Sequence, residues 1–418
     1  METPFDRRDF LKTAGATLAL LLSRQGLASA QAPAANAAAG PAVRFGVIGL
    51  GAWGREIADA LGRTESAQLT ALCDTYEPFL KRAESGAPKA EAIQDWRRIL
   101  ESANVDAIVI ATPTALHREI ALAALQARKH VYCEAPLAAT TEDARAIAAA
   151  AKNASGIVFQ GGLQGRSNPL YRHVLQFVKS GVLGDVALVN AQWSRKESWR
   201  RAAPTADRER ALNWRLEKSS PGVMGEIGIH QLDLVSQYLG ARPTTITGSG
   251  AIAAWRDGRE TPDTASCLIE LGKVRAGVRV TLASSFGGAY TIFQGSNSSL
   301  LLKESRGWLI KEADSALLGW EVYARKESVH DETGIAMVAD ATKLLQAGKE
   351  PGKDAPLEPE KPALVVALES FINSIHTGGP PSCGAADAYA ATVAALKANE
   401  AVLANARIPV SAADYAIT

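Results

Sequence analysis

Short apolar runs alternate with helical patterns of apolar positions through residues 43–165. The apolar runs lie at residues 43–48, 67–74, 105–114, 130–136 and 156–162. Between them, residues 116–128 and 140–154 repeat apolar side chains at helical spacing. Strands that alternate with helices in this way form a parallel sheet with helices on both faces. The pattern therefore predicts an N-terminal doubly wound α/β domain.

The pattern changes after residue 165, where apolar and polar positions begin to alternate with a period of two. Such runs lie at residues 186–196, 244–255, 264–271, 274–285, 290–303 and 307–312. They predict half-buried strands, with a hairpin turn near residue 272. The last long helical patterns cover residues 362–378 and 385–406 and are expected to pack back on the first domain. Residues 166–418 thus predict an α+β domain with an open, mostly antiparallel sheet for substrate binding and oligomerisation.

The first 30 residues have the pattern of an export signal. Adjacent Arg7 and Arg8 precede an apolar run over residues 14–22, and residues 28–30 offer a small-residue cleavage site. This predicts a twin-arginine signal, so that the export machinery is an expected partner and the location is periplasmic or otherwise exported. An uncleaved N-terminal membrane tether is the alternative, although the run is shorter than the ~20 residues needed to span a bilayer. Residues 31–42 are expected to be a linker.

Composition narrows the classes of partner. The 418 residues include 47% hydrophobic and 21% charged residues with a net charge of +1, so no overall field favours nucleic acid or an anionic membrane. The four cysteines are far apart and form no CxxC pair, which argues against a zinc site or a disulfide scaffold. No other group of possible ligand side chains has the spacing of a known metal site, so no metal is expected.

A glycine-rich turn follows the first apolar run and predicts a dinucleotide site. Gly49 permits a tight turn, Gly51 lets the backbone approach a pyrophosphate, and Gly54 allows a helix to pack close to the strand. Asp74 ends the second run 20 residues after Gly54, where a carboxylate binds a ribose 2′-hydroxyl and repels a 2′-phosphate. The sequence favours NAD over NADP; alternatively, Asp74 caps a helix.

From residue 43 onward the chain resembles the Gfo/Idh/MocA oxidoreductases (glucose-fructose oxidoreductase, inositol dehydrogenase and relatives). The resemblance rests on VIGLGAWG, IATPTALH, VYCEAPLA, GVLGDV and GEIGIHQLDLVSQYLG, in that order. It implies a sugar, cyclitol or related substrate and NAD(P), which several exported members hold tightly. Together with the glycine loop and the strand ends, it indicates a set of cofactor-binding residues: Gly49, Gly51, Ala52, Trp53, Gly54, Asp74, Thr112, Pro113, His117, Glu134 and Ala135.

The resemblance also implies a catalytic set that this sequence departs from. The family's Glu-Lys-Pro motif is Glu134-Ala135-Pro136 here, so the catalytic lysine is replaced by alanine. In the family's Asp-x-Gly-x-His-x-x-Asp motif, Glu226 replaces the first aspartate, whereas His230 is unchanged. These departures place ordinary dehydrogenase turnover in question.

The expected acid/base residue is His230, with Glu226 one helical turn away to orient it or to act as a second acid. Asp233 is expected to support His230 from the same helical face, or else to form a surface salt bridge. Lys196 and Lys218 are candidates to replace the missing lysine, although both residues are ordinarily solvated. A core role for His230 is the alternative.

An aromatic and basic cluster in the second half is the expected substrate site. Indole faces pack on sugars, and guanidinium groups bind hydroxyls or carboxylates. The alternative is a domain core and a sheet-mediated subunit contact. The cluster consists of Trp193, Arg195, Trp199, Trp214 and Arg215.

Three functions remain open on the sequence alone. The first is an exported NAD-dependent oxidoreductase acting on a sugar or cyclitol. The second is an NAD-assisted lyase, epimerase or glycosidase that uses transient oxidation. The third is a non-catalytic binding or scaffold protein of the same fold. An exposed sheet face makes a homo-oligomer the expected assembly.

Overall fold

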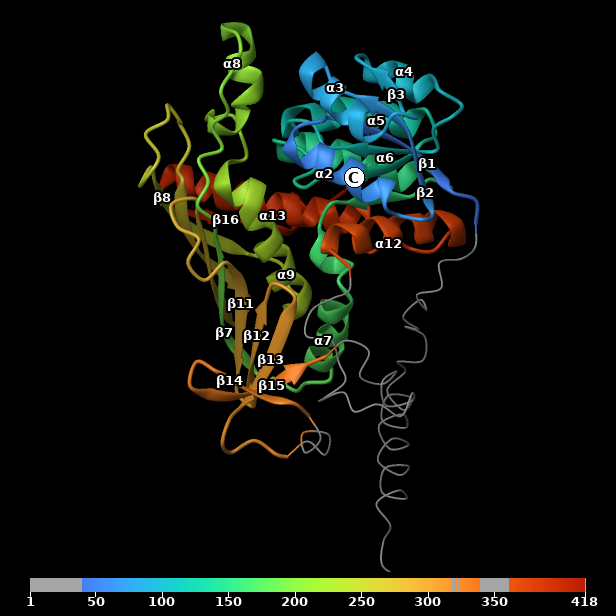
Figure 1. The fold of residues 1–418 in the computed structure, drawn as a ribbon. Helices are drawn as coiled ribbons and strands as arrows, with labels where there is room; N and C mark the ends of the chain where they lie inside the picture. The colour runs from blue at the N-terminus through green and yellow to red at the C-terminus, as the bar shows by residue number, and fades with distance from the viewer. Residues whose placement is uncertain (1–39, 318–320, 322–323, 339–360, 418) are drawn as a thin grey trace, which may run out of the picture.

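The computed structural model describes residues 40–317, 321, 324–338 and 361–417. The expected export signal and most of the expected linker lie outside these residues. The chain forms two sheets that lie side by side and are joined by long C-terminal helices (Figure 1). In the part of the chain that is described, no helix is both long and apolar enough to cross a membrane.

The first sheet is parallel, with the strand order β3-β2-β1-β4-β5-β6 of a dinucleotide-binding Rossmann fold. Its strands are β1 (Val43–Ile48), β2 (Ala67–Cys73), β3 (Glu91–Ile93), β4 (Ala107–Ile110), β5 (His130–Cys133) and β6 (Phe159–Gly161). The helices between them are α2 (Ala52–Gly62), α3 (Glu77–Gly86), α4 (Trp96–Glu101), α5 (His117–Gln126) and α6 (Thr141–Asn153). All four residues of β4 are buried, because helices cover both faces of the sheet.

The second sheet has ten strands in the order β14-β15-β13-β12-β11-β7-β10-β9-β8-β16. These strands are β7 (Val186–Ser194), β8 (Thr245–Ala251), β9 (Thr264–Leu271), β10 (Val274–Thr281), β11 (Ala289–Gly295), β12 (Ser298–Lys303), β13 (Arg306–Lys311), β14 (Lys326–Val329), β15 (Glu332–Met337) and β16 (Arg407–Pro409). All neighbours are antiparallel except β7 and β10. The predicted fold class, a parallel α/β domain followed by a mostly antiparallel sheet, is confirmed.

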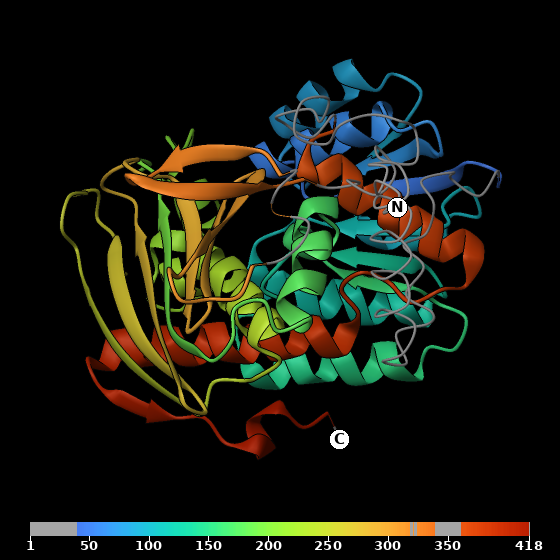
Figure 2. The ribbon, with the colours of Figure 1, turned by 90° about the horizontal axis from the view of Figure 1, so that it is seen from below.

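The remaining helices are α7 (Pro169–Lys179), α8 (Ala206–Leu212), α9 (Ile229–Leu239), α12 (Ala363–Thr377) and α13 (Ala385–Ala404). Among them, α7, α9 and α13 pack on strands of the second sheet, and α12 and α13 pack on the first domain (Figure 2). The alanine-rich α13 packs on both α6 and β8, and α12 packs on α2. Phe371 of α12 lies against Phe45 and Tyr132 of the first sheet, with ring centroids 6.2 and 5.7 Å away. This cluster joins one face of the first sheet to α12, and a second cluster, which includes Ile110 and Val189, extends from the first sheet to the second.

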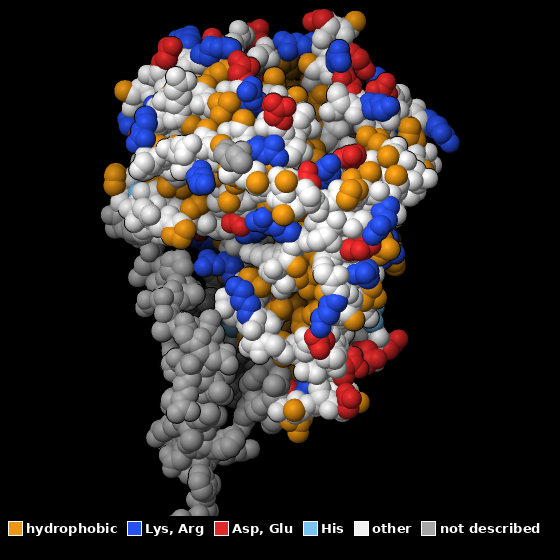
Figure 3. Space-filling view, turned by 180° about the vertical axis from the view of Figure 1, so that it is seen from behind, with side chains coloured by type: hydrophobic (Ala, Val, Ile, Leu, Met, Phe, Trp, Pro, Cys, Tyr) orange, Lys and Arg blue, Asp and Glu red, His pale blue; other side chains and the backbone are white. Residues whose placement is uncertain are grey.

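The opposite face of the second sheet carries exposed apolar side chains, including Leu188 on β7 and Leu268 on β9. The face of the molecule seen in Figure 3 has basic and acidic side chains interspersed, in keeping with the net charge of +1. Such mixing produces no strong field of one sign over that face.

Candidate active site

A single cleft runs between the two domains and is lined by residues from both. Its volume is 1910 Å³, well above the roughly 300–1,000 Å³ of a typical small-molecule pocket. One part of the lining is the edge where β1, β2, β4 and β5 end, and another is β7 with the segments around α8 and α9. The cleft has room for a dinucleotide together with a substrate.

The glycine loop after β1 has the shape that a bound pyrophosphate requires. Gly49 has φ +95°, and a Cβ on Gly54 would lie 1.8 Å from the carbonyl oxygen of Gly49, so neither position tolerates a side chain. A Cβ on Gly51 would meet no atom within 4 Å, because this glycine faces the open cleft. No side chain caps the start of α2, which leaves its first N–H groups, beginning at Ala52, for an anion. The loop fits a dinucleotide.

We expect Gly51→Val to weaken NAD binding by more than tenfold, at least about 1.4 kcal/mol, while leaving stability within about 0.5 kcal/mol. The new side chain enters only the space that the pyrophosphate needs, and Gly51 has φ −57°, which any residue adopts. Calorimetric titration with NAD and urea unfolding measure the two quantities. As the matched control, Gly54→Ala meets the Gly49 carbonyl and should destabilise the nucleotide-free protein. Unchanged NAD affinity in Gly51→Val would contradict this assignment of the pyrophosphate.

Asp74 stands at the end of β2, on the same edge as the glycine loop. Its Oδ2 accepts a hydrogen bond from the Leu50 N–H at 2.7 Å, and its Oδ1 accepts one from the Tyr76 N–H at 2.8 Å. These bonds fix the carboxylate beside the loop while leaving further lone pairs for ribose hydroxyls. A fixed negative charge here disfavours a 2′-phosphate, which supports NAD over NADP.

The turns after β4 and β5 are held together by His117. Its Nδ1 lies 3.0 Å from the carbonyl oxygen of Pro136, and its Nε2 lies 3.0 Å from that of Thr112. Burial lowers the pKa of His117 to about 4, so the ring is neutral and donates its single N–H to one of the two carbonyls. His117 therefore acts on the cofactor edge by positioning Thr112 and its neighbour Pro113, both of which line the cleft.

Two polar atoms at this edge are buried and have no hydrogen-bond partner among the described residues: Thr112 Oγ1 and Glu134 Oε1. Buried polar atoms are rarely left unpaired, because each costs about 1–3 kcal/mol when unpaired. Both atoms lie at the carboxyl ends of the strands, where open parallel sheets bind their ligands. A polar group of the nicotinamide riboside is a fitting partner for them. Ala135, the next residue, lines the same cleft and has no ionisable group.

Burial raises the pKa of Glu134 from 4.5 to about 7, although a bond from Trp53 opposes the shift. Trp53 lies in the first turn of α2, so the Glu134 carboxyl lies between that turn and the backbone of Gly162, whose added Cβ would come within 2.7 Å of Oε2. A carboxyl with this pKa is divided between its neutral and charged forms near neutral pH.

We expect Glu134→Gln to flatten the pH dependence of stability in the nucleotide-free protein. The raised folded-state pKa means that the folded protein holds this proton more tightly than the unfolded chain. Its contribution is complete below about pH 4.5 and is lost as pH rises through about 7, for a total of at most about 3 kcal/mol. Urea unfolding between pH 4.5 and 8 measures it. Parallel curves for the two proteins would show that Glu134 titrates normally.

His230 faces the cleft beside an indole. It is the second residue of α9, and its ring lies against Trp193 of β7, with centroids 5.4 Å apart and planes inclined at 37°. Burial lowers the pKa of His230 to about 4, so its imidazole is neutral at physiological pH and has a lone pair to accept a proton. Among the described residues, no group forms a hydrogen bond to this ring. Within this part of the chain, the ring nitrogens of His230 are therefore unpaired at the wall of the cleft.

Glu226 does not orient His230, contrary to the expectation from helical spacing. Residues Met224–Gly228 form a π-helix, which changes the angular relation between Glu226 and His230. The carboxylate, 5% exposed, accepts a hydrogen bond from Thr114 Oγ1 at 2.8 Å and one from Arg215 Nε at 2.9 Å. Thr114 comes from the first domain, so Glu226 connects the two domains across the cleft and holds Arg215.

Asp233 forms a buried ion pair rather than a surface one. Its carboxylate accepts hydrogen bonds from Arg166 Nε at 2.9 Å and Arg166 Nη2 at 2.8 Å, and the two side chains are only 7% and 12% exposed. Arg166 also lies 3.2 Å from Asp387 of α13. Asp233 thus fixes α9, and with it His230, to the chain that leaves the first sheet.

The expected substrate cluster does converge on the cleft. All five of its members line it: Trp193, Arg195, Trp199, Trp214 and Arg215. The Arg215 guanidinium lies 4.3 Å from the Trp214 ring and 5.8 Å from the Trp199 ring, which stabilises it by cation–π attraction. Lys196, by contrast, is exposed and does not line the cleft, and neither does Lys218. Neither lysine therefore replaces the ionisable side chain that is missing at position 135.

Several residues that line the cleft or support it from behind were not expected from the sequence. Thr114, Arg166 and Arg208 have no motif of their own, and each acquires its role from a residue more than 60 positions away. Only the Thr112-Pro113-Thr114 strand end gave a partial signal for the first of them. No group of three or more His, Cys, Asp or Glu side chains within the described residues is arranged to hold a metal ion.

Comparison with known proteins finds matches for both domains that line the cleft. Residues 43–161 match the family description "Oxidoreductase family, NAD-binding Rossmann fold", and residues 171–300 match "GFO/IDH/MocA C-terminal domain". An uncharacterized oxidoreductase of Streptococcus pneumoniae serotype 4 is 26% identical over 75% of this chain and 83% of its own length. A levoglucosan dehydrogenase of Pseudarthrobacter phenanthrenivorans is 32% identical, over 35% of this chain and 36% of its own.

Other relatives align over about half of each chain. A 2,7-anhydro-N-acetylneuraminate hydratase of Escherichia coli is 28% identical over 50% of this chain and 52% of its own. A solved levoglucosan dehydrogenase in complex with NADH and levoglucosan has the same fold, with a TM-score of 0.70 at 20% identity over 88% of this chain and 99% of that one. The glycine loop, the strand order and both matched domains agree: this chain belongs to the Gfo/Idh/MocA family of oxidoreductases and has its NAD-binding Rossmann domain.

Proposed function

We propose that this protein is an exported NAD-dependent enzyme that oxidises or reduces a sugar, a cyclitol or a derivative of one. The observation that carries the proposal is the continuity of the cleft, in which the dinucleotide edge at Gly51, Asp74 and Glu134 runs on to Trp193 and His230. Indole rings and a guanidinium held between two of them suit a polyhydroxylated ring. Relatives named for inositol and levoglucosan support this class of substrate.

His230 is proposed as the acid/base residue. NAD⁺, when bound, would be the acceptor for a hydride from a carbinol carbon. His230 accepts the hydroxyl proton on its neutral imidazole, whose lowered pKa keeps its lone pair available. Arg215, held by Glu226, is a donor for a neighbouring oxygen of the substrate. Ala135 takes no part in this transfer, which in the family falls to the lysine of Glu-Lys-Pro.

A second candidate function is an NAD-assisted elimination, hydration or cleavage. In such a reaction the hydride is taken from one carbon and later returned, so that the adjacent C–H is acidic only while the carbonyl exists. The observation that favours it is the alanine at position 135, next to a carboxyl whose pKa is about 7. The relative named for hydration of an anhydroneuraminate is in keeping with it. A non-catalytic binding or scaffold protein is the remaining alternative.

Export by the twin-arginine route and assembly into a homo-oligomer belong to the same proposal. The arginine pair at Arg7 and Arg8 supports export. The open face of the second sheet, with Leu188 and Leu268 exposed, supports association through that face. Fractionation of cells and light scattering of the purified protein measure location and mass.

The deciding experiment is to purify the folded, exported protein, denature it and assay the supernatant for NAD(H) by absorbance and mass. Nucleotide in stoichiometric amount, or tight binding of added NAD, supports either enzyme. Incubation with sugars and cyclitols in D₂O then separates the two: net NADH formation supports the oxidoreductase, whereas deuterium in recovered substrate without net NADH supports transient oxidation. A protein that neither retains nor binds NAD is a binding or scaffold protein.

A further inference from the structure

Residues 195–217 follow β7 and end a few residues before the π-helix, and we refer to them as the strap. The strap carries α8, which stands clear of the ten-stranded sheet in Figure 1. Its residues line the same cleft as the dinucleotide edge. No motif in the sequence explains a projecting segment of this length.

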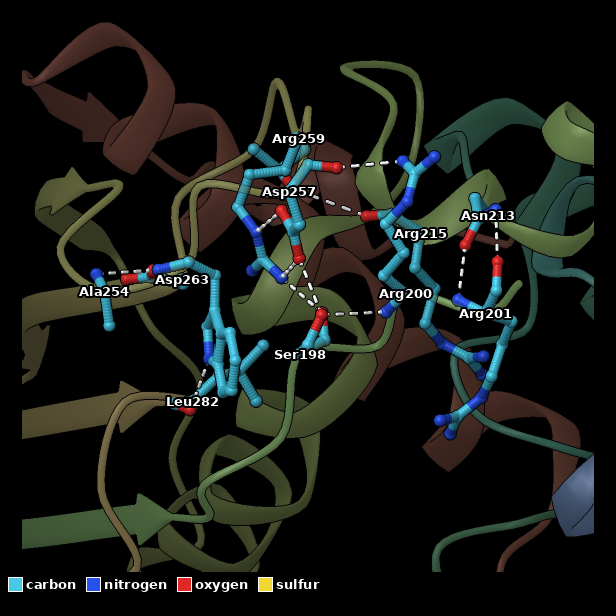
Figure 4. A network of polar contacts seen from close by, with 12 residues as sticks. Ser198, Arg200, Arg201, Asn213, Arg215, Ala254, Asp257, Arg259, Asp263 and Leu282 are labelled. Carbon is cyan, nitrogen blue, oxygen red and sulfur yellow. Dashed lines mark hydrogen bonds and ion pairs between the residues drawn. The ribbon is translucent and has the colours of Figure 1, made fainter. Parts of the chain in front are cut away.

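The base of the strap is fixed by a charged network around Asp257 (Figure 4). Ser198 Oγ donates a hydrogen bond to Asp257 Oδ2 at 2.7 Å, and Arg200 Nη1 donates one to the Asp257 carbonyl at 2.8 Å. Arg259, whose side chain is 1% exposed, binds both oxygens of the same carboxylate at 2.8 Å. These contacts lower the pKa of Asp257 to about 2, so the network stays charged over the physiological range.

The segments of the strap before and after α8 are also hydrogen-bonded to each other. The Arg201 N–H donates to Asn213 Oδ1 at 2.7 Å, and Asn213 Nδ2 donates back to the Arg201 carbonyl at 3.0 Å (Figure 4). Asn213 is buried. This reciprocal pair of hydrogen bonds holds the two segments together at the base of α8, so α8 projects as a preformed unit.

The tip of the strap touches the first domain beside Asp74. Arg208 Nη2 donates a hydrogen bond to the Thr75 carbonyl at 3.0 Å, and its guanidinium lies 5.1 Å from the ring of Tyr76. Tyr76 in turn packs edge-on against Phe79, with centroids 4.9 Å apart. Thr75 and Tyr76 directly follow Asp74, and Tyr76 N–H binds its carboxylate. Arg208 therefore reaches the wall of the pocket expected for the adenosine ribose.

We propose that Arg208 is a cofactor-binding residue, supplied by the C-terminal domain to the adenosine end of NAD. A guanidinium has five N–H donors, and one nitrogen, Nη2, bonds to the protein through the Thr75 carbonyl. The other donors, in a cleft beside Asp74, suit ribose hydroxyls or pyrophosphate oxygens, and the planar group stacks on aromatic rings and bases. The dinucleotide is then held from both domains, and its release requires the tip of the strap to leave Thr75 and Tyr76.

Arg210 provides a matched control on the same helix. It is exposed, and its Nε pairs at 2.7 Å with Glu217 of the strap itself, not with the first domain. Arg210→Ala removes the same charge from the same helix as Arg208→Ala. Any effect that arises from net charge or from weakening of α8 appears in both variants.

The test is calorimetric titration of the full chain with ADP-ribose, which contains the adenosine end and lacks nicotinamide. It requires no substrate, so its result is independent of the proposed function. We expect Arg208→Ala to raise the Kd for ADP-ribose by about tenfold or more, in line with the loss of a charged hydrogen bond. Arg208→Lys should be intermediate, because it keeps the charge but not the planar group. Stopped-flow release of NADH should be faster in Arg208→Ala by a similar factor.

Two results would overturn the proposal. In the first, Arg208→Ala binds ADP-ribose as tightly as the unaltered protein. In the second, Arg210→Ala weakens binding as much as Arg208→Ala, which would assign the effect to charge or helix stability. Circular dichroism melting of each variant establishes that the compared proteins are folded.

Discussion

Replacing His230 with asparagine is expected to lower turnover by roughly 10²–10⁴-fold, the usual contribution of a general base, while NAD binding remains within twofold. Asparagine keeps a polar side chain against Trp193 but has no lone pair basic enough to take a proton. The measurement is steady-state turnover with the substrate found by the screen described above, together with calorimetric titration of NAD.

The control is His330→Asn, at an exposed residue outside the cleft whose φ of +50° asparagine tolerates. In the unaltered enzyme, kcat/KM should decline as pH falls toward 4, since protonation of His230 removes its lone pair. The asparagine variant should lack this acid limb. Full turnover in His230→Asn would assign the proton transfer to another group, with Glu134 the first to test.

Asp233→Ala is expected to destabilise the protein by about 3–5 kcal/mol, because it leaves the buried Arg166 guanidinium without its principal partner. Asp387 lies 3.2 Å from Arg166 but is half exposed, so it compensates only in part. Urea unfolding at a fixed nucleotide concentration measures the change. The loss should appear in the free energy of unfolding and should also lower turnover, since α9 positions His230.

The double variant Arg166→Met, Asp233→Leu separates stability from charge. Replacing both members of a buried ion pair by apolar residues of similar volume is often neutral. We expect it to recover most of the stability lost in Asp233→Ala. A double variant no more stable than Asp233→Ala would show that the site loses packing, and that the unpaired charge is not the cause.

The glycine loop shows how much a local pattern can determine. The tight turn at Gly49, the close approach at Gly54 and the carboxylate at Asp74 are properties of neighbouring backbone and of one strand pair. For this reason the parallel sheet and the NAD-binding fold follow from the sequence, as does the presence of Ala135 in the lining of the same cleft. The hairpin at Gly272, with β9 and β10 antiparallel on either side, is a further local feature predicted correctly.

The helix that bears His230 shows where local patterns mislead. Helical spacing put Glu226 and His230 on one face, but the π-helix at residues 224–228 changes that relation, and Glu226 pairs with Thr114 and Arg215. A π-helical turn of this kind does not change the pattern of apolar residues in the sequence. Asp233 likewise binds Arg166, 67 positions earlier in the chain, and not a solvent-facing partner.

The sequence by itself determined the fold class, the cofactor edge and the identity of the aromatic and basic side chains, because each depends on residues close together in the chain. Only the tertiary structure decided which of these side chains meet in one cleft. It joined Thr114 to Glu226, Arg166 to Asp233 and Arg208 to Thr75. The first and the third of these contacts join the two domains, and the second joins residues 67 positions apart. Their partners are selected by the packing of α13 and α12 on the first sheet, which no local periodicity encodes.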